Sequence, residues 1–181
     1  MKFAAVLKKA GLANLPTITG RTNARATAIV GAAQLDYLLE QVLRHHMIAK
    51  PEKSLFEAYG PLSSFSAKID LARSLGILTK GEASDLHRVR KIRNVFAHSL
   101  QEVSFRDRSI QSHIHQTQVR AATILGKQGA PRFDFELCIL VLSGFLLARI
   151  EVARFRTEPR EFAGHLASLS KHRRSHRARA L

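Results

Sequence analysis

Apolar residues recur at helical spacing along most of this chain, and this pattern constrains the fold more than any other feature. No stretch alternates apolar and polar residues over the length of a useful strand. Proline is rare, with 5 residues in 181, so long helices can run uninterrupted. The sequence therefore predicts an all-α fold, a single-domain bundle of about six helices. The clearest stripe lies in the helix expected at 22–48: Ile29, Ala33, Tyr37, Leu38, Val42 and Leu43.

Capping signals place several helix boundaries. Ser63 or Ser64 can cap a helix that Gly76 closes. Thr79 and Glu82 form a Thr-x-x-Glu capping box, which opens the next helix. Most of the phenylalanines are expected in the core rather than as platforms for stacking nucleic-acid bases. The pattern predicts further helices or helix ranges at 2–10, 79–99, 109–125 and 133–155, and an irregular segment at 52–62.

The charge is strongly basic, with 29 Lys and Arg against 14 Asp and Glu and a net charge of +15. A globular domain this basic usually binds a polyanion, most often nucleic acid, although an anionic membrane surface is a rival. The length suits one domain, which we expect over residues 1–170, followed by a disordered basic tail at 171–181. The candidate phosphate contacts in that tail are Lys171, Arg173, Arg174, Arg177 and Arg179.

The number of cysteines and the length of the apolar runs indicate the cellular compartment in which the protein is expected. Cys138 is the only cysteine, which excludes a disulfide framework and suits a reducing environment. The longest apolar run, 137–148, is too short to span a bilayer, and no secretory signal is present. We therefore expect a cytoplasmic protein with no membrane partner. No cofactor or metal site is expected either, because the histidine groups lack an acid or cysteine at ligand spacing.

Three sequence blocks follow one another between residues 60 and 100. They read Ser-Phe-Ser-Ala-Lys at 64–68, Leu-Gly-Ile-Leu at 75–78, and Arg-Lys-Ile-Arg-Asn-Val-Phe-Ala-His at 90–98. In order and spacing they closely resemble the mannitol operon repressor family, and a looser resemblance extends back over 35–43. The resemblance implies an all-helical protein linked to negative control of transcription, acting through nucleic-acid or partner binding. No helix-turn-helix is evident in the sequence.

The third block also resembles the Arg-Asn-x-x-x-His signature of HEPN ribonucleases, at Arg93, Asn94 and His98. This resemblance implies a HEPN-like helical fold and, as an alternative function, a metal-independent endoribonuclease. His98 would then act as general base or acid, Arg93 would hold the phosphate, and Asn94 would orient either group. A second alternative is a non-enzymatic protein-interaction module, which the strongly apolar segment 133–155 favours.

A helical wheel places the polar residues of this block on one stripe. His87, Lys91, Asn94 and His98 lie within a narrow arc of the expected helix. Together with Arg90, the two residues His87 and Lys91 are the candidate nucleic-acid contacts of this helix, because they present cationic or protonatable groups along one side.

Arg93 lies about 140° from His98 on the same wheel, inside the apolar arc. A guanidinium there must be paired or must line an interface, because an unpaired buried charge is very costly. A homodimer that joins the two copies of this segment would unite both residues in one basic cleft. In a structural role, His98 would cap carbonyls at the helix end, and Arg93 would bind one of three acids: Asp36, Glu40 or Asp70.

Overall fold

The computed structural model describes residues 23–47, 52–126 and 129–154. Within these ranges the chain forms six α-helices and a short 3₁₀ helix and contains no strand, so the predicted all-α, single-domain fold is confirmed. The expected helix at 2–10, the boundary near 170 and the basic tail lie outside the described residues. The helices are α2 (Ala24–His46), α3 (Phe65–Ser74), α4 (Lys80–His98), α5 (Arg108–His115), α6 (Ala121–Leu125) and α7 (Pro131–Arg154), with the 3₁₀ helix at Lys53–Leu55.

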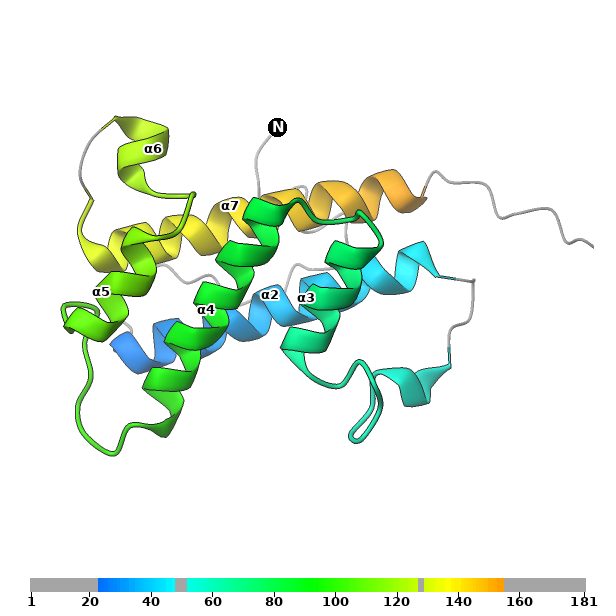
Figure 1. The fold of residues 1–181 in the computed structure, drawn as a ribbon, viewed down its shortest axis with the longest axis horizontal. Coiled ribbons are helices and arrows are strands. Elements are labelled where there is room, and N and C mark those ends of the chain that lie inside the picture. The colour runs from blue at the N-terminus through cyan, green and yellow to red at the C-terminus, as the bar shows by residue number, and fades with distance from the viewer. Residues whose placement is uncertain (1–22, 48–51, 127–128, 155–181) are drawn as a thin grey trace, which may run out of the picture.

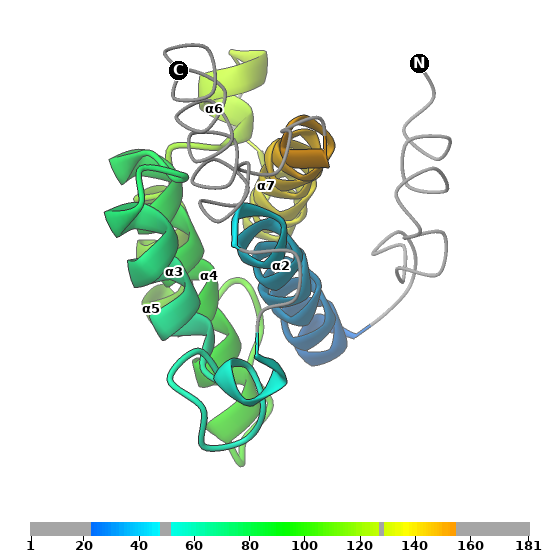
Figure 2. The ribbon, with the colours of Figure 1, turned by 90° about the vertical axis from the view of Figure 1, so that its right-hand side faces the viewer.

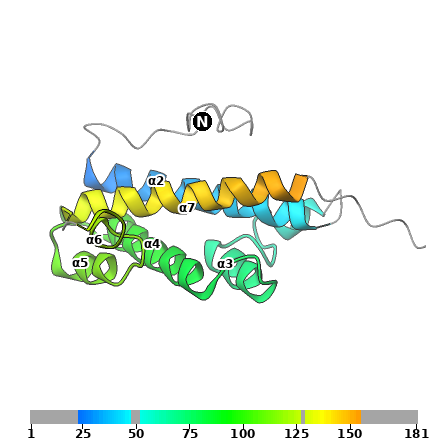
Figure 3. The same ribbon diagram turned by 90° about the horizontal axis from the view of Figure 1, so that it is seen from above.

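The helices form two layers. The long helices α2 and α7 lie side by side and run in the same direction (Figures 1 and 3). The shorter helices α3, α4 and α5 cover one side of this pair, as the end-on view shows (Figure 2). Among the described residues, no helix is long and apolar enough to cross a membrane.

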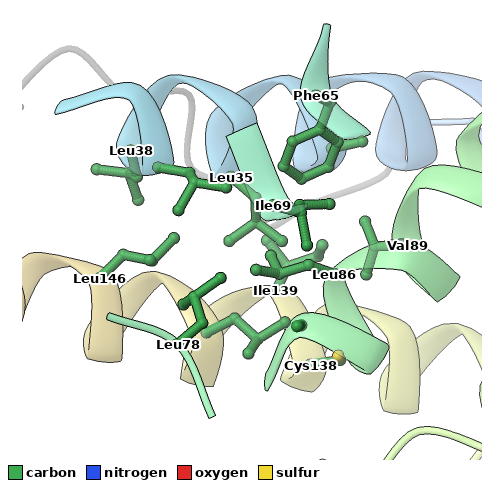
Figure 4. Packing of buried hydrophobic residues seen from close by; sticks show 14 of the residues in the cluster. Leu35, Leu38, Phe65, Ile69, Leu78, Leu86, Val89, Cys138, Ile139 and Leu146 are labelled. Atoms are coloured by element: carbon green, nitrogen blue, oxygen red, sulfur yellow. The ribbon is translucent and has the colours of Figure 1, made fainter. Parts of the chain in front are cut away.

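The core lies between the two layers (Figure 4). Three aromatic rings close its end near α5: the Phe105 ring lies 5.0 Å from that of Phe96 and 5.1 Å from that of Phe135. Tilted contacts at this separation are favourable for aromatic pairs. Aliphatic residues from four helices fill the rest, among them Leu35, Leu38, Ile69, Leu86, Val89, Ile139 and Leu146.

Local sequence signals explain the main boundaries. Asn23 caps α2, with its side chain accepting a hydrogen bond from the Ala26 amide at 2.7 Å. Pro131 occupies the first position of α7, where a missing amide hydrogen costs nothing. Gly76 ends the α3 region with a φ of 70°, a left-handed conformation that favours glycine. The predicted starts and ends of α2, α3, α4 and α7 are therefore close to those observed.

The helix expected at 109–125 is wrong as a single element, because the chain forms α5 and α6 with a break between them. The cause is Asp85 of α4, which is buried and accepts hydrogen bonds from two backbone amides in the break. The Gln118 amide lies 3.0 Å from both carboxylate oxygens, and the Val119 amide lies 3.2 Å from one. These amides cannot continue a helix while they bind this carboxylate.

The phenylalanines divide between core and surface. Phe56, Phe65, Phe105 and Phe135 are buried, as predicted. Phe133 and Phe145 on α7 are not buried and are 46% and 47% exposed. A helix that is apolar on every side does not reveal from its sequence which face the core will cover.

Candidate functional site

Helix α4 carries the third sequence block and is fixed in place at its start. The Thr79 hydroxyl accepts a hydrogen bond from the Glu82 amide, and the Glu82 carboxylate accepts one from the Thr79 amide at 2.8 Å. This is the predicted capping box. One face of the helix enters the core through Ala83, Leu86, Val89, Ile92 and Phe96. The opposite face therefore turns outward along the whole helix.

The polar stripe predicted by the wheel lies on this outward face. Lys91 and His98 are exposed, and Asn94 is half-buried. None of the three side chains forms a hydrogen bond or an ion pair with another described residue. His87 differs, because its Nε2 lies 3.1 Å from Asp70 Oδ1 on α3. In the described chain, the stripe thus contains three polar side chains without a bonding partner and one, His87, that lies beside an acid.

Arg93 does not have the buried ion pair expected of a structural role. It is half-buried and contacts no acid among the described residues. The three acids named as its partners are engaged elsewhere: Asp36 and Glu40 bind Lys68, and Asp70 lies beside His87. The expectation that Arg93 is held by a core acid is therefore wrong for the described part of the chain.

Arg90 is the other arginine of this block without a side-chain bond to a described residue. It is half-buried, and its Nε is shielded from solvent without a hydrogen-bond partner among the described residues. Arginines that hold the fold together differ, because each donates to an acid or carbonyl, as do Arg25, Arg44, Arg73, Arg88, Arg132 and Arg149.

His98 is the last residue of α4, but it does not cap the helix carbonyls as expected. Arg25 of α2 binds the chain just after α4, with its Nη2 donating to Ser99 O at 2.8 Å and Gln101 O at 3.2 Å. A shallow cavity of about 340 Å³ lies between these segments, lined by residues 23–25 and 100–104. Neither Arg93 nor His98 lines this cavity.

A basic environment near the stripe was not evident from the sequence. His113 of α5 has a pKa below its usual value of 6.5, first because of burial and then because of the positive charges of Lys91 and Arg88. Three protonatable or cationic side chains from two helices therefore influence one another. Only the packing of α5 against α4 brings them together, and no local sequence signal could have predicted it.

The charge itself is unevenly placed. The described residues contain 16 Lys and Arg and 12 Asp and Glu, which leaves +4. The other residues of the chain contain 13 Lys and Arg and 2 acids, which leaves +11. The five predicted phosphate contacts at 171–181 belong to this second group and lie outside the described residues. Most of the net positive charge is thus carried by segments outside the described residues.

Comparison with known families decides the identity of the fold. The sequence profile of the mannitol repressor family, MtlR, matches residues 23–136. This chain belongs to the mannitol repressor family. As a member it is a regulatory protein of the mannitol-repressor type. No curated protein matches the chain.

A solved MtlR structure has the same fold. It is the X-ray structure of the MtlR–HPr complex from Escherichia coli, and the match has a TM-score of 0.56 at 19% identity. The similarity covers 81% of this chain and 96% of that one. The two proteins therefore share the same overall fold.

Within the matched MtlR region, the first two sequence blocks are structural. Ser64 caps α3, accepting from the Ala67 amide at 3.2 Å, and Phe65 is buried. Lys68 Nζ lies 2.8 Å from Asp36 Oδ1 and 2.9 Å from Glu40 Oε2, joining α3 to α2. Sequence analysis did not single out this lysine. The third block differs, because several of its polar side chains have no bonding role in the described fold.

Proposed function

We propose that this MtlR-family chain acts as a negative regulator of gene expression by binding a protein partner, with HPr as the first candidate. The observation that carries the proposal is the similarity over 96% of an MtlR chain that was solved in complex with HPr. A regulator without a helix-turn-helix needs another route to transcription, and a protein contact provides one. The expected location is the cytoplasm.

The outward face of α4 is the surface we propose for this contact. Lys91, Asn94 and His98 present a cation, an amide and an imidazole that no described residue engages. Such groups can bind a partner without first breaking bonds within the chain. Arg93 lies half-buried beside them and adds a planar group with five hydrogen-bond donors.

A binding titration tests this proposal. Purified Escherichia coli HPr is titrated into the full chain, into Lys91→Glu, and into Lys80→Glu as a control. Lys80 is also exposed on α4, but it lies eleven residues earlier, about 16 Å along the helix. We expect binding to the wild type and to Lys80→Glu, and at least ~10-fold weaker binding to Lys91→Glu. No measurable binding to the wild type would overturn HPr as partner, and equal binding by both variants would exclude this face.

Nucleic-acid binding is the second candidate, and the basic charge favours it. The segments outside the described residues carry +11, including five cations at 171–181. Charge of this kind binds phosphates without reading sequence, and the affinity falls steeply with salt. Deleting 171–181 should therefore flatten the dependence of DNA or RNA affinity on salt concentration. An unchanged slope would show that the tail makes no phosphate contacts.

A homodimer remains part of the proposal. Two-fold symmetry could place both copies of the 93–98 segment in one basic cleft and so join Arg93 with His98. Light scattering at micromolar concentration tests this arrangement. A monomer, or a dimer that Lys91→Glu leaves intact, would contradict an interface at this segment.

A further inference from the structure

The outer face of α7 is unusually apolar for a surface. Phe133 is 46% exposed and Leu140 is 49% exposed. Gly144 lies in the same outward arc, where an added Cβ would meet nothing within 4 Å among the described residues. From Phe133 to Gly144, the side of α7 turned away from the core thus presents mainly hydrocarbon.

Helix α2 extends the apolar surface. Its residues Ile29 and Tyr37 are 38% and 46% exposed, and Ala33 between them is also exposed. The helices lie side by side (Figure 3), and Gln34 Nε2 donates to Ser143 Oγ at 3.1 Å where they meet. Tyr37 and Ala33 lie on the outer side of this contact on α2, and Phe133, Leu140 and Gly144 lie on its outer side on α7. We call this surface the outer α2–α7 face and define it by Ala33, Tyr37, Phe133, Leu140 and Gly144.

Contiguous apolar surface of this kind marks an interaction site on a soluble domain. The two layers of the bundle do not use it, because α3, α4 and α5 pack on the other side of the α2–α7 pair (Figure 2). A matching apolar surface exists in the chain itself. Residues 2–10 place Phe3, Val6, Leu7 and Ala10 at helical spacing, with lysines at 2, 8 and 9 on the remaining sides.

We propose that residues 2–10 dock as an amphipathic helix on the outer α2–α7 face. The apolar residues of the segment would cover exposed hydrocarbon there, while the lysines would remain in water. A nine-residue helix is about 14 Å long and is marginal in isolation, so it needs such a surface to form. The docked segment would also keep the face from a second copy of the chain.

The length of the connection permits this docking. Twelve residues, 11–22, separate the segment from the Asn23 cap of α2, and a chain of that length spans at most about 40 Å. Helix α2 has 23 residues, or about 35 Å, so the segment can reach any part of the face. A short tether also gives an effective concentration in the millimolar range, which favours this occupant over a second copy.

Hydrogen exchange on the full chain tests the proposal. Amides of residues 2–10 should exchange at least ~10-fold more slowly than in an unstructured peptide. Leu7→Asp in the segment and Leu140→Asp on the face should each abolish this protection. The matched controls are Ala5→Asp, on the opposite side of the segment, and Leu100→Asp, which is fully exposed in the loop after α4. Both controls should keep the protection, and thermal unfolding should show that all four variants fold.

Two results would overturn the proposal. Exchange of residues 2–10 at unstructured rates in the wild type would show that the segment does not dock. Protection that survives Leu140→Asp would show that it docks elsewhere. Light scattering distinguishes this docking from contact with a second copy of the chain. If the protection disappears on dilution together with a dimer-to-monomer transition, the face binds a second copy and the intramolecular contact is rejected.

Discussion

Arg149 on α7 binds both carboxylate oxygens of Glu82 on α4, with its Nη2 2.8 Å from Oε1 and 2.9 Å from Oε2. The same arginine donates from Nε to the Ile77 carbonyl at 2.8 Å. Burial raises the pKa of Glu82, but hydrogen bonds from Thr79 and the charge of Arg149 outweigh it and hold the pKa below 4.5. The Arg149 guanidinium thus joins the start of α4, the helix that carries the candidate site, to α7.

Replacing Arg149 with Met should therefore loosen α4 from α7. The substitution leaves Glu82 with its capping role but without a counter-charge, and we expect a loss of about 1–3 kcal/mol in unfolding free energy. Urea unfolding measures this loss. Arg108→Met is the control, because Arg108 is exposed and forms no side-chain bond with a described residue. Equal midpoints for the two variants would mean that the contact contributes nothing.

Lys68 provides the second test of the fold. Burial lowers its pKa, but hydrogen bonds and charges of Asp36 and Glu40 outweigh this and raise the pKa above 10.5. Burial likewise raises the pKa of Glu40, yet Lys68 and Arg44 bring it below 4.5. Stability from Glu40 is thus present above its unfolded pKa and is lost as pH falls through its folded pKa. The stability that Lys68 contributes is present below its ordinary pKa of 10.5 and is lost as the pH rises through its higher folded pKa.

Lys68→Met should cost about 2–4 kcal/mol near neutral pH, because it leaves Asp36 without its cation and Glu40 with Arg44 alone. It should also flatten the decline in stability below pH 4.5 that Glu40 contributes to in the wild type. Urea unfolding at several pH values measures both effects. Lys53→Met, at an exposed position, should change neither. A pH profile parallel to the wild type would show that Glu40 does not depend on Lys68.

The depressed pKa of His113 gives a prediction about the α4–α5 surface. Burial and the charges of Lys91 and Arg88 disfavour the imidazolium, so its titration midpoint in NMR should lie below 6.5. The histidine is more readily protonated when unfolded, so it reduces stability as pH falls through and below 6.5. Lys91→Ala should raise the midpoint, while Lys80→Ala should leave it unchanged. A midpoint unaffected by Lys91→Ala would show that the two groups do not interact.

Arg93→Ala should change the stability little. Arg93 is half-buried and contacts no acid in the described chain, and substitutions away from such contacts usually stay within about 0.5 kcal/mol. The prediction reverses the expectation from the wheel alone, which placed this guanidinium in the apolar arc. Thermal unfolding checks it. A loss as large as that of Lys68→Met would reveal a partner outside the described residues.

Local chemistry made much of the fold predictable. The Thr79–Glu82 capping box and the Ser64 cap involve residues three apart, so the sequence contains the whole interaction. The polar stripe on α4 was equally accessible, because helical periodicity fixes which residues share a face. The wheel could not show that Asp70 would lie beside His87, since that contact depends on how α3 packs against α4.

Long-range contacts account for the errors. Asp85 interrupts the expected 109–125 helix by binding amides 33 and 34 residues later, which no local window contains. Lys68 finds its acids 32 and 28 residues earlier, on α2. The exposure of Phe133 and Phe145 has a related cause, because the apolar sequence of α7 fits several orientations and the packing of the other helices selects one.

The final prediction concerns catalysis, and it separates the regulatory proposal from the ribonuclease alternative. An imidazole that acts as a general base is normally oriented by a third group, and His98 has no acid bonded to it in the described chain. We therefore expect the purified chain to leave structured and unstructured RNA intact. The assay uses both kinds of RNA, with DNA for comparison, in the presence and absence of EDTA.

Cleavage would contradict this expectation, and its features would identify the responsible group. A metal-free reaction must use the ribose 2′-OH as nucleophile, so DNA would survive, EDTA would not inhibit, and products would carry 2′,3′-cyclic phosphates. Loss of a general base typically reduces the rate about 10²–10⁴-fold, which His98→Ala would then show. His115→Ala, at an exposed histidine of α5, is the matched control. Equal loss in both variants, or none in either, would trace the cleavage to a contaminating nuclease or to groups other than His98.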